Sequence, residues 1–210
     1  LSITGPGDPF GTKGFYSGLY TPQDPASLAV VEGMELTPYD VVLDLCAGRG
    51  VKTTAMADLG ARVLACDLSE GKLTDAIKLA TKLGVIERVK TQPIDATDPP
   101  ADLGTYSHVL VDAPCTGLGT LRRHPEIAWR RQESDVDALA ETQRAMLEAA
   151  ASHVAPGGVL TFAVCSFHPR EMPDLELDGF TLERFEPPAR PSEGGDLFQL
   201  KRWRREQEIP

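Results

Sequence analysis

Cysteine is scarce in this sequence, and no two cysteines lie at metal-binding spacing. The 210 residues include four, at Cys46, Cys66, Cys115 and Cys165, and no CxxC pair can be written. Structural zinc sites use closely spaced Cys and His ligands, so no metal site is expected. A disulfide framework is not expected in a chain this long either. The cysteines therefore favour a reducing, intracellular setting.

Long apolar runs are absent as well. No stretch of about 18 apolar residues occurs, so the sequence predicts no membrane-spanning helix. The first residues, LSITGPGDPFGTKG, have neither the basic start nor the apolar stretch of a signal peptide, and without an initiator Met they suggest a piece of a longer protein. Apolar residues make up 41% of the chain and charged residues 25%, which is typical of one globular domain.

Positive charge is in short supply and unevenly placed. The net charge is −10, and eight of the 21 Lys and Arg fall in two segments, LRRHPEIAWRR (121–131) and KRWRR (201–205). Either segment can be a nucleic-acid contact or a solvated charged face, and for KRWRR alone both interpretations are equally open. Because phosphate contacts supply most non-specific affinity, an acidic chain of this kind is expected to need a separate RNA-binding domain or subunit to bind RNA strongly.

Strand-like and helix-like segments alternate from residue 24 onward. Residues 1–23, rich in Gly, Pro and Thr, are predicted to be an irregular segment, and 24–210 to be one domain. Asp24 and Pro25 open a helix whose apolar positions reach Leu36. Further helices are predicted at 51–59, 69–83 and 134–154, strands at 41–45, 62–66, 88–91, 107–111 and 159–164, and an antiparallel pair at 179–185 and 197–203. Pro156-Gly157-Gly158 is expected to end the longest helix.

This order predicts an α/β fold: a mostly parallel seven-stranded sheet with a C-terminal antiparallel pair and helices on both faces. Ligands on such sheets bind at the carboxyl ends of the strands. The unusual residues of this sequence fall at those ends.

The loop after the first strand has features of a nucleoside-type site. Its glycines, Gly48 and Gly50, allow a tight turn and close approach to a ligand. Asp67 ends the second strand and can accept bonds from ribose hydroxyls, whereas Asp95 follows the third and can lie near an adenine. No third glycine completes a dinucleotide fingerprint, so S-adenosylmethionine, which has no pyrophosphate, fits better than NAD. Asp44 either lies near the methionine part of that cofactor or caps the loop.

Two cysteines follow neighbouring strands: Cys115 within DAPCTG and Cys165 within VCS. Lone cysteines are commonly structural, and we interpret Cys46 and Cys66 in that way. A thiol at the active edge has a specific use, because C5 of cytosine is a poor nucleophile. Addition of a thiolate to C6 makes C5 enamine-like and able to attack a methyl sulfonium. An acid near N3 and a base for the C5 proton complete the set.

Four segments, in this order, carry a family resemblance: QDPAS, LDLCAGRGVKT, DAPCTGLGTLRRHPEIAWRR and VCSFHP. They resemble the motif set of the NOL1/NOP2/Sun family of RNA 5-methylcytosine methyltransferases, which includes bacterial 16S rRNA enzymes, over roughly residues 14–203. The resemblance implies a Rossmann-like, S-adenosylmethionine-dependent methyltransferase domain. It also implies methyl transfer to C5 of a cytidine in rRNA, or in tRNA, in the cytoplasm, with no membrane and no metal.

The resemblance also assigns roles to residues. It implies that Cys165 is the nucleophile, that Cys115 aids product release, that Asp112 contacts the target base and the cofactor, and that Lys52 lies near the active site. The implied cofactor-binding residues are Cys46, Ala47, Gly48, Arg49, Gly50, Lys52, Asp67, Asp95 and Asp112. From the charge of the first basic segment we predict RNA contacts at Arg122, Arg123, His124 and Arg130, with a plain loop residue as the other interpretation of His124.

The sequence departs from the family pattern in three places. Arg49 and Val51 stand where the family loop has Pro and Gly, VCS replaces TCS, and 169–173 (PREMP) replaces an acidic stretch. A non-catalytic relative that binds RNA or protein as an assembly factor is therefore the alternative function, and an NAD enzyme is the third. The sequence leaves the roles of two side chains undecided. Trp129 can stack on a base or pack under its loop, and His168 can polarise Cys165 or make no contact with it.

Overall fold

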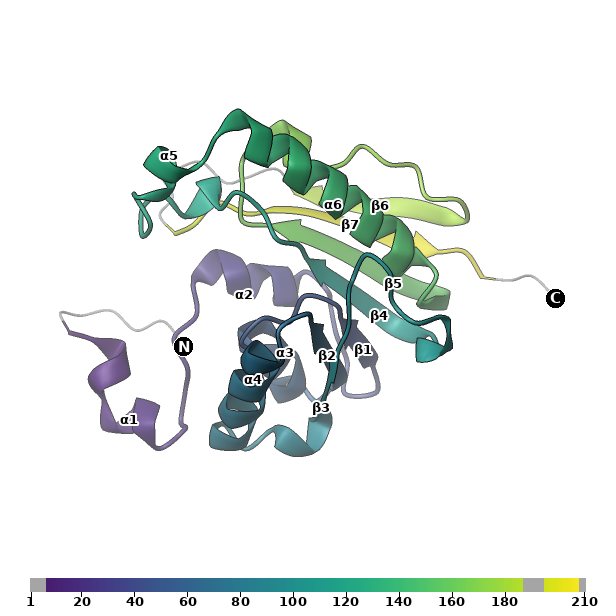
Figure 1. Cartoon of the computed structure of the whole chain (residues 1–210). Coiled ribbons are helices and arrows are strands. Elements are labelled where there is room, and N and C mark those ends of the chain that lie inside the picture. The colour runs from purple at the N-terminus through teal and green to yellow at the C-terminus, as the bar shows by residue number, and fades with distance from the viewer. Residues whose placement is uncertain (1–6, 187–194, 208–210) are drawn as a thin grey trace.

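Seven strands form one sheet in the order β3-β2-β1-β4-β5-β7-β6 (Figure 1). The structure is a computed structural model that describes residues 7–186 and 195–207. The strands are β1 (Val41–Asp44), β2 (Arg62–Asp67), β3 (Val89–Pro93), β4 (Tyr106–Asp112), β5 (Val154–Val164), β6 (Phe180–Glu186) and β7 (Gln199–Arg205). The first five pair in parallel, and β7 runs antiparallel to both β5 and β6. The predicted sheet with its antiparallel C-terminal pair is confirmed.

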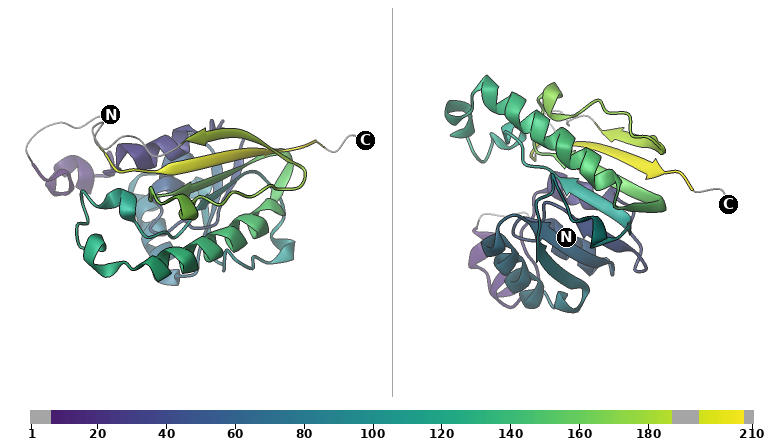
Figure 2. Two further views of the ribbon diagram at one scale, coloured as in Figure 1. Left: turned by 90° about the horizontal axis from the view of Figure 1, so that it is seen from above. Right: turned by 45° about the vertical axis from the view of Figure 1, so that its right-hand side comes forward.

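Helices cover both faces of this sheet (Figure 2). The helices are α1 (Lys13–Tyr16), α2 (Pro25–Glu32), α3 (Val51–Asp58), α4 (Glu70–Lys82), α5 (Ile127–Arg130) and α6 (Glu133–Ala151). Successive strand residues point to opposite faces, so Leu43 packs in one buried cluster with Leu147 of α6, and Val42 in another with Met56 of α3. Each such side chain stabilises the fold by about 2 kcal/mol. The predicted α/β layers follow from this alternation.

The predicted ends of two helices were wrong. The helix that begins after Asp24 ends at Glu32, because Gly33 caps it and Glu35 adopts a left-handed φ of 56°. The longest helix ends at Ala151, and 156–158, predicted to be its break, lies inside β5. Strand pairing explains why residues 156–158 belong to β5. A Cβ on Gly158 would lie 2.9 Å from the carbonyl oxygen of Ser107, so glycine lets β5 close on β4.

Part of the segment predicted to be irregular is helical. A 3₁₀ turn (Pro9–Gly11) and α1 form because Asp8 and Thr12 cap them: Phe10 N–H donates to Asp8 at 2.9 Å, and Phe15 N–H to Thr12 at 3.1 Å. Residues 1–6 lie outside the described part. The division into a segment 1–23 and a domain 24–210 stays a prediction.

The sheet order places a crevice between β1 and β4. From β1 the chain moves outward to β2 and β3, then returns to add β4 and β5 on the other side. At such a switch point the loops after the two central strands diverge and leave room for a ligand. Within the described ranges, no helix combines the length and the apolar character needed to cross a membrane.

Candidate active site

The loop between β1 and α3 forms one wall of the crevice. Both glycines predicted to shape it have left-handed backbone, with φ of 56° at Gly48 and 82° at Gly50, but for different reasons. A Cβ on Gly48 would meet no heavy atom within 4 Å, so this residue faces open space. A Cβ on Gly50 would lie 2.6 Å from the Cβ of Ala76, so glycine there lets α3 and α4 pack. Gly48 therefore borders the crevice, and Gly50 supports it from behind.

Two adjoining hollows occupy the crevice and share Cys46, Gly48 and Asp112 in their walls. The first is polar, and Asp44, Ala47, Arg49 and Lys52 also line it. The second is largely apolar. Besides Asp67 and Lys72, its further lining residues are Leu45, Leu68, Ile94, Ala96, Pro114 and Met146. One end of the crevice therefore suits a charged group, and the other suits a flat apolar ring beside a carboxylate.

Asp67 joins the two loops that border the second hollow. Its carboxylate accepts hydrogen bonds from the backbone N–H of Gly48 at 3.1 Å and of Ser69 at 2.9 Å, and Lys72 Nζ lies 3.3 Å away. Asp95 is placed differently, although its neighbours in sequence line this hollow. Its side chain is exposed, and hydrogen bonds from the Thr97 hydroxyl (2.6 Å) and N–H (2.9 Å) hold its pKa below the usual value.

Asp44 is buried at the end of β1. The Thr53 hydroxyl donates to its Oδ2 at 2.7 Å, and Oδ1 has no hydrogen-bond partner among the described residues. Burial raises the pKa of Asp44 to about 7. Its bond to the side chain of Thr53 leaves one oxygen beside the polar hollow, so Asp44 both anchors α3 and lines the site.

A charged pair spans the polar hollow. Lys52 Nζ, from the first turn of α3, lies 2.6 Å from Asp112 Oδ2 at the end of β4. The ammonium group also lies 5.0 Å from the centre of the Phe198 ring, which is a cation–π contact. Both side chains are therefore held in the crevice by these contacts.

Cys115 and Cys165 lie together beside this charged pair. Their Sγ atoms are 2.9 Å apart, because β4 and β5 are neighbours and both cysteines follow the carboxyl ends of these strands. The hydrogen bond from the Cys115 thiol lowers the pKa of Cys165, and the positive charge of Lys52 acts in the same direction. The same hydrogen bond, together with burial, raises the pKa of Cys115. Of the two thiols, Cys165 is therefore the readier thiolate and nucleophile.

The other two cysteines differ in position: Cys66 is buried in the core, and Cys46 lines both hollows. Burial raises the pKa of Cys66 to about 12 and that of Cys46 well above its ordinary value, so neither is a ready thiolate.

The sequence analysis missed one buried acid. Glu171 lies six residues after Cys165, in the segment that replaces the family's acidic stretch, and it is fully buried. An acid between two prolines was the signal that could have found it. His168 Nδ1 accepts from the N–H of Arg170, and no bond joins it to Cys165.

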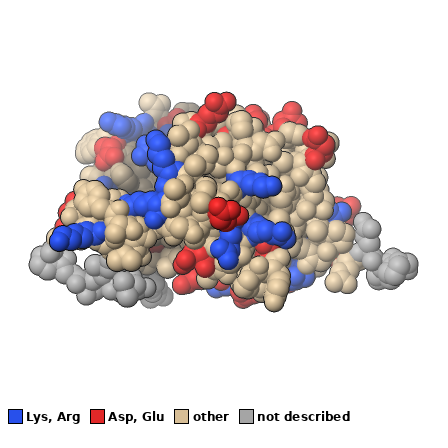
Figure 3. Space-filling view, turned by 90° about the horizontal axis from the view of Figure 1, so that it is seen from below, with Lys and Arg blue, Asp and Glu red and all other residues tan. Residues whose placement is uncertain are grey.

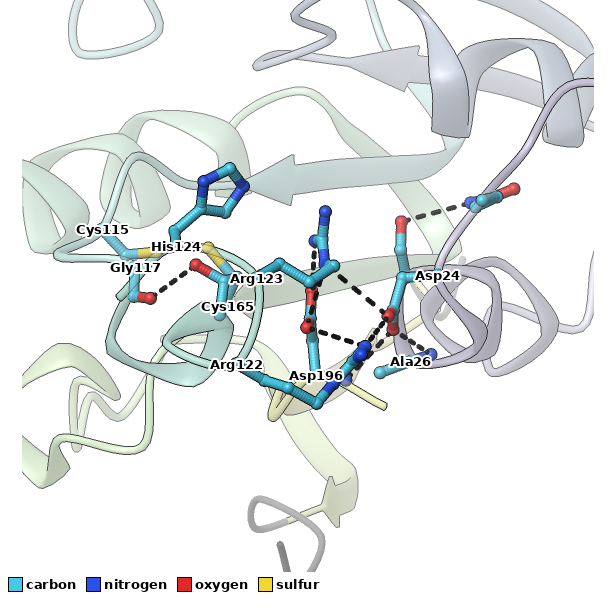
Figure 4. Close-up of polar contacts among 12 residues, drawn as sticks. Asp24, Ala26, Cys115, Gly117, Arg122, Arg123, His124, Cys165 and Asp196 are labelled. Carbon is cyan, nitrogen blue, oxygen red and sulfur yellow. Dashed lines mark hydrogen bonds and ion pairs between the residues drawn. The ribbon is translucent and has the colours of Figure 1, made fainter. Parts of the chain in front are cut away.

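The first basic segment is partly engaged inside the protein (Figure 4). Arg123 Nε lies 2.9 and 3.1 Å from the two carboxylate oxygens of Asp196, whose side chain is fully buried. Arg122 reaches Asp24 at 3.5 Å and Asp196 at 3.7 Å. These two arginines thus tie the loop after Cys115 to the start of α2 and to the segment before β7, which sequence reasoning did not foresee.

The outer part of that segment is free to meet a partner. His124 makes only an exposed contact with Glu126, at 3.3 Å, and Arg130 has no ion pair within the described residues. Trp129 is 90% exposed, so it does not pack under its own loop. Arg131 Nε donates to the carbonyl of Thr116 at 3.1 Å and holds α5 against the loop of Cys115.

The second basic segment is not an open surface. It forms β7, where Lys201, Arg202 and Trp203 are buried. Arg202 pairs with Glu35 at 2.8 Å and Glu183 at 3.1 Å. The interpretations of KRWRR as nucleic-acid contact or as solvated face were therefore wrong for Lys201 and Arg202, whereas Arg204 is exposed. On the face seen in Figure 3, basic and acidic side chains are interspersed, without one continuous basic area. No group of three or more potential metal ligands lies within 7–186 or 195–207.

Comparisons with known proteins match this sequence and fold. A family model described as 16S rRNA methyltransferase RsmB/F matches residues 31–176. The ribosomal RNA small subunit methyltransferase B of Thermus thermophilus is 39% identical over 162 residues, which are 77% of this chain and 40% of that protein. The protein of the same name from an Enterobacter species is 37% identical over 162 residues, 75% of this chain and 37% of that one.

Solved structures agree. The crystal structure of NSun6 from Pyrococcus horikoshii with SFG matches 96% of this chain and 57% of its own, with a TM-score of 0.84 and 27% identity. This chain spans less than half the length of the two curated relatives named above. The family model covers more than half of the chain. The chain belongs to the 16S rRNA methyltransferase RsmB/F family, which confirms the resemblance drawn from its motifs.

Proposed function

We propose that this chain is the catalytic domain of an RNA cytosine-5 methyltransferase that transfers a methyl group from S-adenosylmethionine to a cytidine of ribosomal RNA. The observation that carries the proposal is the thiol pair of Cys115 and Cys165, 2.9 Å apart, beside the Lys52–Asp112 pair. Methylation of a nitrogen or a ribose oxygen needs no thiol, whereas methylation at C5 needs a thiolate to activate the base.

The residues around the two hollows fit S-adenosylmethionine. Asp67 offers the carboxylate for the ribose hydroxyls, and the apolar residues of the second hollow suit an adenine ring. The unpartnered oxygen of Asp44 offers an acceptor for the amino group of the methionine part. Open space beside Gly48 leaves room for the loop 46–52 to approach the ligand. We assign Asp95 to the adenine side, although Thr97 holds its side chain in this structure. When bound, S-adenosylmethionine supplies the methyl group on a sulfonium, as an electrophile.

The chain's own residues divide the remaining work. The Cys165 thiolate adds to C6 of the cytosine, Asp112 holds a proton at N3, and C5 gains the electron density to take the methyl group. Once Cys165 is bonded to C6 it no longer accepts the hydrogen bond of Cys115, and the thiol proton of Cys115 is released to solvent. The Cys115 thiolate then removes the C5 proton, N3 returns its proton to Asp112, and the C6–S bond breaks to return the Cys165 thiolate.

Ribosomal RNA is the first substrate to test, because the relatives compared above carry that name, and transfer RNA is the second. We assign RNA contact to His124, Arg130 and Arg122, whose side chain is 58% exposed although it also reaches Asp24 and Asp196, whereas Arg123 holds its loop through Asp196. With a net charge of −10, the chain is expected to obtain most RNA affinity from a further domain or subunit. The free thiols suit work in the reducing cytoplasm.

The test is methyl transfer from labelled S-adenosylmethionine to unmodified small-subunit RNA, to small ribosomal subunits and to a transfer RNA pool. Nucleosides are then resolved by mass spectrometry. We expect label in 5-methylcytidine, its loss in Cys165→Ala, and its retention in Cys66→Ala, a matched change at a buried cysteine outside the site. Cys115→Ala should accumulate a protein–RNA complex that survives denaturing electrophoresis. Cofactor binding without label on any of these substrates would contradict the proposal and favour the assembly-factor alternative.

A further inference from the structure

A buried carboxyl group lies behind the two cysteines. Glu171 ends a 3₁₀ turn (Pro169–Glu171), and its side chain is fully buried. Burying a carboxylate without partners costs several kcal/mol, so its partners must be accounted for. Within 7–186 and 195–207 no Lys or Arg pairs with it. Neutral donors surround it instead.

Four donors converge on Glu171. The Thr116 N–H donates to Oε1 at 2.7 Å, and the Thr116 hydroxyl donates to Oε2. The Ser166 hydroxyl donates to Oε2 at 2.5 Å, and Gln143 Nε2 lies 3.3 Å from Oε1. Each of its two oxygens accepts two of these four hydrogen bonds, so the carboxyl group is held on both sides.

The positions of these donors in the chain show which loops the carboxyl group of Glu171 joins. Thr116 directly follows Cys115, and Ser166 directly follows Cys165. One carboxyl group therefore joins the two loops at the residues next to the paired thiols. Gln143, from α6, also donates to the carbonyl of Pro114 at 2.8 Å, so the helix supports the same arrangement. The Arg170 side chain fastens the 3₁₀ turn to α6 from outside, at 2.7 Å from Glu133.

We propose that Glu171 is a positioning residue: it bridges the loops of Cys115 and Cys165 and sets the spacing of the two thiols. The consequence for catalysis rests on the proposed function, but the spacing itself does not. Strand pairing brings the loops to one edge, and beyond the strand ends the N–H of Gly119 donates to the carbonyl of Cys165 at 3.0 Å. The bridge from Glu171 adds a constraint at the residues directly after each cysteine.

Thiol spacing can be measured without any methyl transfer. Phenylarsine oxide captures two thiols only when both reach one arsenic: two As–S bonds form, and the arsenic oxygen leaves as water with the two thiol protons. We expect the intact chain to capture one equivalent at Cys115 and Cys165, located by mass spectrometry of peptides. Glu171→Gln should capture it about tenfold more slowly or more weakly. Glu133→Gln, the same change at an exposed acid touching the same turn, should behave like the unchanged protein.

Kinetics supply the second measurement. Glu171 does not line either hollow, so Glu171→Gln should lower kcat about tenfold while the KM for S-adenosylmethionine stays unchanged. Glu171→Asp, which keeps the acceptors on a shorter stem, should recover part of the capture rate and of kcat. If Glu171→Gln fails to fold, two single-arm variants take its place. Ser166→Ala removes the Ser166 arm of the bridge, and Thr116→Val removes the hydroxyl bond of the other arm but keeps its N–H bond, so both should slow capture and Ser166→Ala should slow it more.

The outcomes distinguish the proposed bridge of Glu171 from the proposed methyl transfer. Slower capture with lower kcat in Glu171→Gln, and neither in Glu133→Gln, supports the bridge. Slower capture in a protein with no methyl transfer at all supports the bridge and contradicts the proposed function. Unchanged capture in a folded Glu171→Gln, or in both single-arm variants, overturns the bridge whatever the activity.

Discussion

The thiol of Cys115 lies 2.9 Å from the thiol of Cys165, although 50 residues separate them in the chain. The parallel pairing of β4 and β5 brings them together, with Asp112 opposite Ala163 near the strand ends. Because one thiol donates a hydrogen bond to the other, their pKa values move apart: the pKa of Cys165 falls and that of Cys115 rises. A chemical difference thus arises between two side chains of the same type.

This relationship predicts the behaviour of Cys165 when its partner is removed. In Cys115→Ala the hydrogen bond that favours the Cys165 thiolate is gone, so the pKa of Cys165 should rise. Alkylation of Cys165 by iodoacetamide near neutral pH should then slow severalfold, and its pH profile should move to higher pH. Rates measured by peptide mass spectrometry across pH provide the check. Cys66→Ala is the control, and an unmoved profile in Cys115→Ala would exclude the hydrogen bond as the cause.

The two glycines of the cofactor loop should respond differently to one methyl group. Gly50→Ala places its Cβ 2.6 Å from that of Ala76 on a left-handed backbone, and we expect a loss of about 3 kcal/mol in the free energy of unfolding. Gly48→Ala meets no atom within 4 Å and should lose only about 1 kcal/mol from its backbone strain. Urea unfolding compares them.

Gly48→Ala should also change the affinity for the cofactor, although it should cost little stability. The added methyl group of Gly48→Ala points into open space beside the hollow, so S-adenosylmethionine should bind more weakly to this folded variant. Calorimetric titration measures the affinity. Equal affinity in Gly48→Ala and the unchanged chain would argue against ligand approach at this residue.

Trp129 offers a test of RNA contact outside the reaction centre. It is 90% exposed on α5, and Arg131 holds this helix to the loop of Cys115. A base stacked on an aromatic side chain contributes about 1–3 kcal/mol, so Trp129→Ala should weaken RNA binding about tenfold and leave the free energy of unfolding unchanged. Filter binding and urea unfolding measure the two quantities. Tyr39→Ala, at a 91% exposed aromatic on another loop, should leave both as they were.

The buried Asp44 predicts a pH dependence of stability with a definite sign. Its pKa is about 7 in the folded chain, raised by burial from an ordinary value of 3.8. Its stabilising contribution is therefore complete below pH 3.8 and is lost as the pH rises to about 7. Asp44→Asn cannot ionise, so at pH 8 it should be more stable than the unchanged chain by about 2 kcal/mol, with no gain near pH 4.

Unfolding free energies measured from pH 4 to pH 8 test this prediction. Asp95→Asn is the control: hydrogen bonds from Thr97 hold the pKa of Asp95 below its ordinary value of 3.8, so its contribution stays constant from pH 4 to pH 8 and the variant should differ from the unchanged chain by the same amount throughout. A constant difference between Asp44→Asn and the unchanged chain across this range would show that Asp44 does not carry the dependence.

The sequence was most informative where local pattern and chemistry agree. Alternating strands and helices predicted the sheet, and strand ends placed Asp67 and the two cysteines at one edge, because parallel strands share a carboxyl edge. Features that depend on distant partners were not predictable. Arg202 is buried because Glu35 and Glu183, far away in sequence, pair with it. Glu171 was missed for the same reason, since its role depends on Thr116 and Ser166.

The insertion of β7 between β5 and β6 has a consequence for how the chain folds. The strand that carries Cys165 gains its second neighbour only from residues 199–205, which leave the ribosome after β6. Gln199 at the start of β7 also donates to the carbonyl of Ser166, at 2.9 Å. During synthesis, a chain that has emerged as far as β6 still has β5 as an open sheet edge. The surroundings of Cys165 are therefore completed only when β7 has been synthesised and has paired with β5.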